Sequence, residues 1–172
     1  SFFIGGNTKQ VWENILRDDY DNWDVPILQE EYNAYKQDNP LPYKELIFPD
    51  VLKVLNEVKS RGLKIGLASS SVKADILRAL EENRLDCFFD VVLSGEEFKE
   101  SKPNPEIYLT ALKHLNVEAN QALIIEDSEK GIAAGVAAGV EVWAIKDNRF
   151  GMDQGAAKGL LDNLVDVLGL LK

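Results

Sequence analysis

The chain has 172 residues, of which 45% are hydrophobic. This length and composition are typical of one globular domain with at most a small appendage, and they exclude a disordered chain. Its 29 acidic and 19 basic residues give a net charge of −10, which disfavours binding to nucleic acid or to an anionic membrane.

The first part of the chain is predicted to be helical. Between about Thr8 and Asn39, apolar residues recur at helical spacing, first in VWENIL and then in PILQEEYNAYKQ, and no strand pattern interrupts them. The proline-rich segment NPLPYKELIFPD then ends this pattern. We therefore expect a helical unit followed by a linker.

After the linker, predicted strands alternate with predicted helices. Asp50 can cap a helix that ends at Arg61 and Gly62. Strands are expected in LKIGLA, FDVVLS, ALIIE and VEVWAI, and helices over residues 72–83, 105–115, 128–138 and 159–171. This alternation predicts an α/β fold with a doubly wound, Rossmann-like parallel sheet, which binds ligands at the carboxyl ends of its strands.

Cys87 is the only cysteine of the sequence, so no intrachain disulfide can form, and a reducing compartment is favoured. It lies among apolar residues in LDCFFDVV, and we expect a buried, structural thiol. The opening SFFIGG is too short for a signal sequence, and no apolar run approaches the roughly 20 residues of a membrane span. We expect a cytoplasmic protein that is a monomer or a weak dimer.

Polar residues gather at the ends of predicted strands. Ser69 lies in LASSS, Lys102 lies in ESKPNP, and Glu126 and Asp127 follow the apolar run LII. A hydroxyl near free backbone N–H groups binds phosphate, a lysine adds positive charge, and two carboxylates attract Mg²⁺. Singly, each has a structural explanation as a helix cap, a solvated lysine or a charge pair at a helix start. Together they predict a phosphoryl-transfer site.

In this order of motifs the chain resembles the haloacid dehalogenase superfamily, in its helical-cap branch of β-phosphoglucomutase-like phosphatases and mutases. The matching segments are LASSS, SKPNPEIYLTAL and LIIEDSEKGIAAGVAAG. The resemblance implies a partial helical cap over residues 1–45 and an α/β core over residues 46–172 that lacks its first strand. It also implies a magnesium-dependent phosphatase that acts on a small phosphorylated metabolite, including sugar phosphates.

The resemblance also implies roles for individual residues. Ser69 and Lys102 are expected to act in catalysis by binding phosphate, and Ser70 is expected to bind substrate beside them. Glu126 and Asp127 are expected at the Mg²⁺ site. In the helix that follows, Gly and Ala residues share one face, which predicts close packing against the sheet behind the acid pair.

The segment GGNTKQ looks like the part of the cap that meets the substrate, which puts Thr8 and Lys9 near a second phosphate or a sugar. Mutases of this group usually have arginine where Lys9 stands, and a lysine lacks the bidentate fork. Nor does a basic residue between Arg17 and Lys36 match the cap lysine of such mutases. These departures favour a phosphatase over a phosphomutase of the β-phosphoglucomutase type.

The family's first motif, an apolar strand that ends in Asp-x-Asp, is absent from the sequence. Asp19 and Asp21 have the spacing but follow a helical pattern, so a solvated loop is expected; a calcium loop would need Gly where Asp24 stands. Without that strand, a gap of about 9–10 Å would separate the strands ending at Ser69 and Glu126. We therefore expect an N-terminally shortened piece, inactive alone, of a larger protein whose upstream aspartate forms an aspartyl-phosphate.

Two other classes use similar parts. A signalling receiver domain has an acid pair, a hydroxyl and a lysine at strand ends, but its acid pair comes first in the chain, whereas here it comes last. A non-catalytic module that binds phosphate without a nucleophile is also compatible with the sequence.

Overall fold

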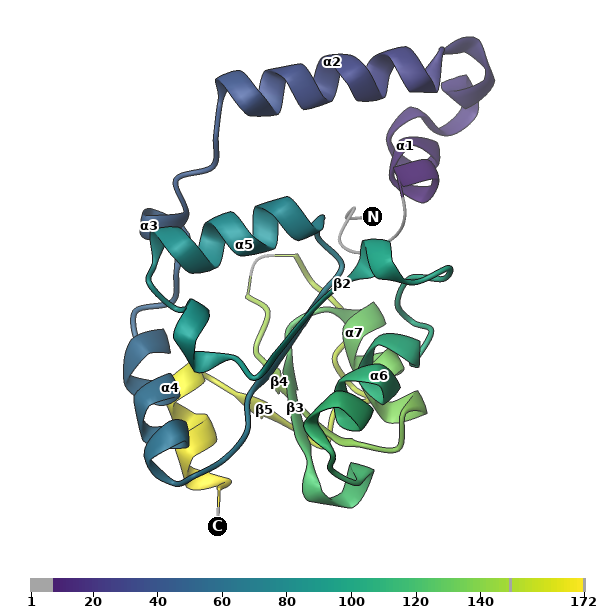
Figure 1. Cartoon of the computed structure of the whole chain (residues 1–172). Helices are drawn as coiled ribbons and strands as arrows, with labels where there is room; N and C mark the ends of the chain where they lie inside the picture. Colours follow the sequence, from purple (N-terminus) through teal and green to yellow (C-terminus); the bar gives the residue numbers. More distant parts are fainter. Residues whose placement is uncertain (1–7, 149, 172) are drawn as a thin grey trace.

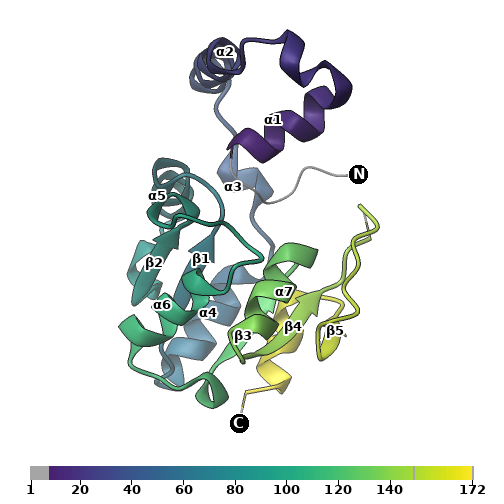
Figure 2. The ribbon, with the colours of Figure 1, turned by 90° about the vertical axis from the view of Figure 1, so that its right-hand side faces the viewer.

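The computed structural model describes residues 8–148 and 150–171. Two long N-terminal helices, α1 (Thr8–Leu16) and α2 (Val25–Asp38), lie on one side of an α/β core, with the 3₁₀-helix η1 (Arg17–Asn22) between them (Figures 1 and 2). The Trp12 indole N–H donates to Gln29 at 2.8 Å, and the ring of Trp12 packs edge-on against Tyr32. A short linker then leads through α3 (Tyr43–Leu46) to the core. The predicted N-terminal helical region is confirmed.

The core alternates strands with helices, as the sequence predicts. Its larger elements are α4 (Val51–Ser60), β1 (Gly66–Ser69), α5 (Lys73–Glu82), β2 (Val91–Ser94), α6 (Glu106–Leu115), β3 (Leu123–Glu126), α7 (Glu129–Ala137), β4 (Glu141–Ile145) and β5 (Gly159–Leu161). Short 3₁₀-helices connect or follow them: η2 (Asp86–Phe88), η3 (Gly95–Glu97), η4 (Ala119–Gln121) and η5 (Leu164–Gly169).

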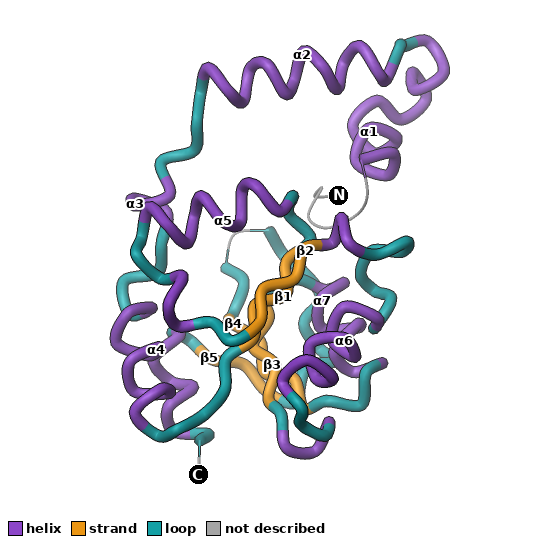
Figure 3. Tube along the Cα trace, viewed as in Figure 1, coloured by secondary structure: helices purple, strands orange, loops and turns teal. Residues whose placement is uncertain are grey.

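The strands form two groups, and every strand pairing is parallel. β1 pairs with β2, so that Ser69 lies opposite Ser94, and β3 pairs with β4, which pairs with β5 (Figure 3). Among the described residues, no hydrogen-bonded ladder joins β1 to β3. The prediction of a doubly wound, parallel α/β fold is confirmed, with its strands divided between two sheets.

Alternate side chains of each strand pack on opposite faces. Leu67 and Val92 contact a buried cluster made by α4, α5 and the turn after α5. Ala68 and Leu93 contact α6 and α7 instead. The same alternation holds in β3. Leu123 and Ile125 face α4 and η5, whereas Ile124 faces α7. The carboxyl ends of β1, β2 and β3 lie on the side of the core that faces α1 and α2 (Figure 1).

The small residues of α7 allow the helix to lie close to the sheet. A Cβ atom on Gly135 would come within 2.6 Å of Val142 Cγ2 and 3.1 Å of Ile124 Cδ1. Gly131 and Ala138, on the same face, are also buried. The prediction that this Gly and Ala face packs on the sheet is confirmed.

The expectation of a helix over residues 159–171 is wrong. Its first three residues form β5, which pairs with β4, and Leu161 accepts a hydrogen bond from Lys146 N at 2.9 Å. Asn163 then begins η5 through reciprocal side-chain and backbone hydrogen bonds with Asp166. Short apolar runs have no period that separates strand from helix, and pairing with β4 decides the outcome here.

Two smaller expectations also differ from the structure. Cys87 is exposed and not buried, because the 3₁₀-turn η2 directs Phe88 and Phe89 into the core beside α5 and leaves the thiol outside. Asp50 stands at the N-cap position of α4, but its side chain makes no capping hydrogen bond. Among the described residues, no helix combines the length and the apolar character needed to cross a lipid bilayer.

Candidate functional site

Ser69 ends β1, and the loop that follows is held by the neighbouring strand. The Ser69 hydroxyl accepts a hydrogen bond from Ser71 N at 3.1 Å. The Ser94 hydroxyl donates to Ser71 O at 2.8 Å, and Lys73 N donates to Glu96 at 2.7 Å. The N-cap residue of α5 is Val72, without a side-chain hydrogen bond, so none of the serines caps that helix. The Ser69 hydroxyl is therefore fixed inside its own loop.

Ser70 lies in the tightest part of this loop. Its side chain is half-buried, and a Cβ atom on Gly95 would come within 3.2 Å of the Ser70 Cα. A Cβ atom at this position would make a tighter contact than most, so Gly95 helps the loop after β1 to lie against the end of β2.

Lys102 reaches the centre of the strand-end region from the loop before α6. It is only 7% exposed. Its Nζ donates to Ala68 O at 3.1 Å, to the Tyr108 hydroxyl at 2.8 Å and to Glu126 Oε1 at 2.5 Å. A lysine ammonium has three N–H donors, so these contacts use all of them. Lys102 thus connects the end of β1 to the end of β3.

The carboxylate of Glu126 is surrounded by donors. Oε1 accepts from Lys102 and from the Tyr108 hydroxyl, each at 2.5 Å, and Oε2 accepts from the Ser128 hydroxyl and from two backbone N–H groups. Burial alone would raise the pKa of Glu126, but the charge of Lys102 and these hydrogen bonds outweigh burial and hold the pKa below its usual value. Glu126 is therefore ionised and fully occupied by hydrogen bonds within the protein.

Tyr108 belongs to this cluster. It lies in the matching segment SKPNPEIYLTAL, but no role was predicted for it from the sequence. It lies on the buried side of α6 and is 7% exposed, and the Lys102 ammonium stands 4.7 Å from the centre of its ring. Burial, and then the charge of Glu126, raise the pKa of the Tyr108 hydroxyl, which stays protonated. The signal in the sequence is weak: a tyrosine on a buried helix face needs a polar partner.

Gln154 is a second residue that sequence reasoning missed. Its buried side chain donates to Asp127 O at 2.9 Å and to Ile145 O at 2.8 Å, and it accepts from Asp147 N at 2.9 Å. It therefore joins the ends of β3 and β4 and fixes the backbone of Asp127. It lies in a segment without regular structure, so no periodicity pointed to it.

Glu126 and Asp127 have different surroundings, although they are adjacent. Asp127 is exposed, whereas Glu126 binds Lys102 and Tyr108. Carboxylate oxygen suits Mg²⁺, and Asp127 is the carboxylate of the pair that an ion could reach from solvent, because Asp127 is exposed and the side chain of Glu126 is buried. Among the described residues, no group of three or more His, Cys, Asp or Glu side chains is placed to hold a metal. The metal roles of both carboxylates therefore stay predictions.

The residues expected to meet the substrate from the N-terminal helices, Thr8 and Lys9, lie in α1. Thr8 begins α1, but its side chain and the preceding GGN of the cap segment lie outside the described residues. Lys9 is exposed, and its Nζ lies 3.7 Å from Glu13 of the same helix. Asp19 and Asp21 are exposed in η1, as expected for a solvated segment.

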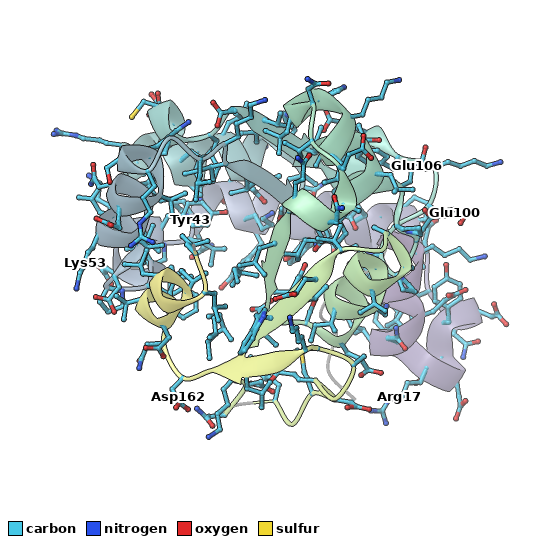
Figure 4. All side chains as sticks on the ribbon, turned by 90° about the horizontal axis from the view of Figure 1, so that it is seen from below. Arg17, Tyr43, Lys53, Glu100, Glu106 and Asp162 are labelled. Carbon is cyan, nitrogen blue, oxygen red and sulfur yellow. The ribbon has the colours of Figure 1, made fainter. Side chains whose placement is uncertain are left out.

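A pocket of about 540 Å³ adjoins Lys102. Its lining includes Lys99, Glu100, Asn104 and Lys130, so side chains of both charges from the loop before α6 and from the first turn of α7 line it. Asn104 shapes the loop, since it donates to Glu100 at 2.7 Å and accepts from Glu106 N at 2.9 Å. Glu100 and Glu106 themselves lie at the periphery of the core (Figure 4).

The protein is similar to known hydrolases of phosphorylated compounds. The family described as haloacid dehalogenase-like hydrolase matches residues 1–145. A phosphorylated carbohydrates phosphatase of Thermotoga maritima is 35% identical over 129 residues, which cover 72% of this chain and 59% of that protein. A phosphoglycolate phosphatase of Aquifex aeolicus is 30% identical over 139 residues, which cover 81% of this chain and 63% of that protein. The chain thus spans less than two thirds of both relatives.

Solved structures also resemble this fold. The crystal structure of a β-phosphoglucomutase from Clostridium difficile superposes with a TM-score of 0.75 at 25% identity, over 91% of this chain and 71% of that one.

Proposed function

Because the chain belongs to the haloacid dehalogenase-like hydrolases, we propose that Ser69, Lys102 and Asp127 form the phosphate and magnesium site of a phosphatase that acts on a small phosphorylated metabolite. One observation carries the proposal. The Lys102 ammonium lies 3.1 Å from Ala68 O, next to Ser69, and 2.5 Å from Glu126, next to Asp127. A buried positive charge thus lies between the end of β1, where Ser69 stands, and the end of β3, which supports the proposal.

Each residue has a defined task in this proposal. The Ser69 hydroxyl and the N–H groups of its loop bind oxygens of the phosphoryl group. Lys102 offsets the negative charge of that group, and Glu126 holds the Lys102 ammonium in place through their hydrogen bond. Asp127 would hold Mg²⁺, which when bound would offset further negative charge on the phosphoryl oxygens.

The nucleophile is not among the described residues at this site. We therefore include an aspartate from outside these 172 residues, which would attack phosphorus to form an aspartyl-phosphate while the bond from phosphorus to the substrate oxygen breaks. The second aspartate of the Asp-x-Asp motif would give its proton to the leaving oxygen, and water would then hydrolyse the aspartyl-phosphate to release phosphate. On this proposal the chain alone binds phosphate without turning over substrate.

The names of related proteins support the proposed substrate class. The related proteins are named as phosphatases of phosphorylated carbohydrates and of phosphoglycolate, which supports a small phosphorylated metabolite, sugar phosphates included. A phosphatase is favoured over a phosphomutase because Lys9, the residue proposed to meet a second phosphate, is an exposed lysine next to Glu13 and not an arginine fork. The pocket beside Lys102 leaves room for the part of the substrate that is not transferred.

The test compares this chain with a longer form that carries an upstream apolar strand ending in Asp-x-Asp. Both are assayed for phosphate release from a panel of phosphorylated metabolites, with and without Mg²⁺. We expect magnesium-dependent release from the longer form, loss of release on Lys102→Met, and little change on Ser60→Ala, a serine on the far end of α4. Absence of release over the whole panel would contradict the phosphatase proposal, and phosphate binding without turnover in the longer form would favour a non-catalytic binding module.

A further inference from the structure

The hydroxyl of Tyr108 stands between the two charged groups of the strand-end cluster. It accepts from Lys102 Nζ at 2.8 Å and donates to Glu126 Oε1 at 2.5 Å. Its ring also faces the Lys102 ammonium, at 4.7 Å from the ring centre. Tyr108 therefore contacts both members of the ion pair, and it does so from α6, a rigid element packed in the core.

All three N–H groups of Lys102 are in use, so a phosphoryl oxygen can reach the ammonium only by replacing one of its partners. Glu126 is charged and close, and Tyr108 is held in turn by Glu126. Ala68 O is a neutral acceptor and, at 3.1 Å, the most distant of the three. Hydrogen bonds between charged groups are stronger than those to a neutral carbonyl. The contact with Ala68 O is thus the one that a phosphoryl oxygen replaces.

Ala68 directly precedes Ser69, so the replaceable N–H already points towards the carboxyl end of β1. We infer that Tyr108 is a positioning residue: with Glu126 it anchors two N–H groups of Lys102 and directs the third to the phosphoryl group bound at Ser69. This inference rests on the proposed function, since it takes Lys102 to contact the phosphoryl group. It adds Tyr108 as the group that sets the direction of that contact.

The wild-type chain allows a first test by NMR, with inorganic phosphate as the probe. On saturation with phosphate, the ¹³Cε signal of Lys102 should move, because its third N–H passes from Ala68 O to phosphate. The ¹³Cζ signal of Tyr108 should stay, because its hydroxyl remains bonded to Glu126 in both states. Movement of the Tyr108 signal with an unchanged Lys102 signal would overturn the inference.

A variant gives the second test. Tyr108→Phe keeps the ring and removes the hydroxyl, so the ammonium loses one of its two anchors. Without phosphate, the Lys102 ¹³Cε signal should move towards that of exposed lysines while the other lysine signals stay in place. Phosphate should bind about tenfold more weakly, as expected for loss of one hydrogen bond to a charged group. Tyr35→Phe, at an exposed tyrosine of α2, is the matched control and should bind within about twofold of wild type.

The outcomes separate this inference from the proposed function. If wild type binds phosphate and Lys102→Met weakens that binding, but Tyr108→Phe binds like wild type, the inference is wrong and the proposed site stands. If Tyr108→Phe lowers only the melting temperature and leaves the Lys102 signal and the phosphate affinity unchanged, the role of Tyr108 is structural and the inference is again wrong. If wild type binds no phosphate, both the proposed site and this inference fail.

Discussion

The carboxylate of Glu126 occupies the space in which a side chain on Gly131 would begin. A Cβ atom built on Gly131 overlaps the carboxylate carbon and both its oxygens. Ser128 sets this arrangement, because its hydroxyl donates to Glu126 Oε2 at 3.1 Å and accepts from Gly131 N at 3.1 Å. The first turn of α7 and the end of β3 are thus fitted to each other around one carboxylate.

Gly131→Ala should therefore destabilise the protein, although alanine favours a helix more than glycine does. The added methyl group has to displace Glu126 or α7, which costs about 1–3 kcal/mol in the free energy of unfolding. Chemical denaturation measures this. Gly169→Ala is the control, because a Cβ there meets no atom within 4 Å, and it should change stability by less than about 0.5 kcal/mol. Equal stability of the two variants would show that Glu126 is free to move.

Ser69→Ala should weaken the binding of inorganic phosphate by about tenfold or more, the effect of losing one hydrogen bond to a charged group. The variant also loses the acceptor for Ser71 N, so the loop after β1 should show faster amide exchange. Calorimetry measures the affinity. Ser60→Ala, at an exposed serine that donates to Glu57 O, is the control. Wild-type affinity in Ser69→Ala would remove this hydroxyl from the proposed site.

Asp90 should contribute to stability in a pH-dependent way. Its carboxylate accepts from Lys59 Nζ and from Ile65 N, each at 2.7 Å, and these two hydrogen bonds lower the pKa of Asp90 below its ordinary value of 3.8. Because the pKa is lower in the folded state, the contribution is present above that ordinary value and is lost as the pH falls through the folded pKa.

Asp90→Asn should accordingly lower the melting temperature at neutral pH, with a smaller difference from wild type in strong acid. Asp86→Asn replaces a nearby exposed carboxylate and serves as the control. A difference for Asp90→Asn that is the same at both pH values would contradict the assignment.

Lys36 of α2 and Asp75 of α5 form an ion pair across the linker between cap and core, with Nζ 2.5 Å from Oδ2. The hydrogen bond from Lys36 to Asp75 is the main reason that the pKa of Lys36 lies above its usual value. Lys36→Met should loosen the cap, so that a protease cuts linker residues 39–42 about two- to fivefold faster, as a partly exposed ion pair allows. Lys44→Met, at an exposed lysine of α3, should leave the rate unchanged. Equal cleavage of both variants would mean that the pair does not hold the cap.

The parts of the fold that could be predicted are those with a repeating signal. Helices and strands of the core alternate at lengths that leave a clear period, and parallel strands bring their carboxyl ends to one edge. For that reason Ser69, Lys102 and Glu126 could be predicted to gather there, and hydrogen bonds through Lys102 do join these strand ends.

The choice of partners could not be predicted in the same way. Tyr108 and Gln154 act through side-chain hydrogen bonds that include residues distant in sequence, Glu126 and Asp127, and no spacing rule specifies such bonds. β5 is three residues long, too short to show a period of two, and its pairing with β4 overrides the helical pattern of the segment that follows. Cys87 was expected to be buried, but the 3₁₀-turn η2 rotates it away from its apolar neighbours.

The division of the strands into two groups has a consequence for deuterium uptake. Among the residues that the structure describes, β1 pairs only with β2, and β3 pairs only with β4. Successive amides of a strand point to opposite sides, so only every second amide in β1 and β3 donates to a neighbouring strand. Deuterium should therefore enter β1 and β3 at alternate residues, whereas Trp143 and Ala144 of β4, which are paired on both sides, should both take it up slowly.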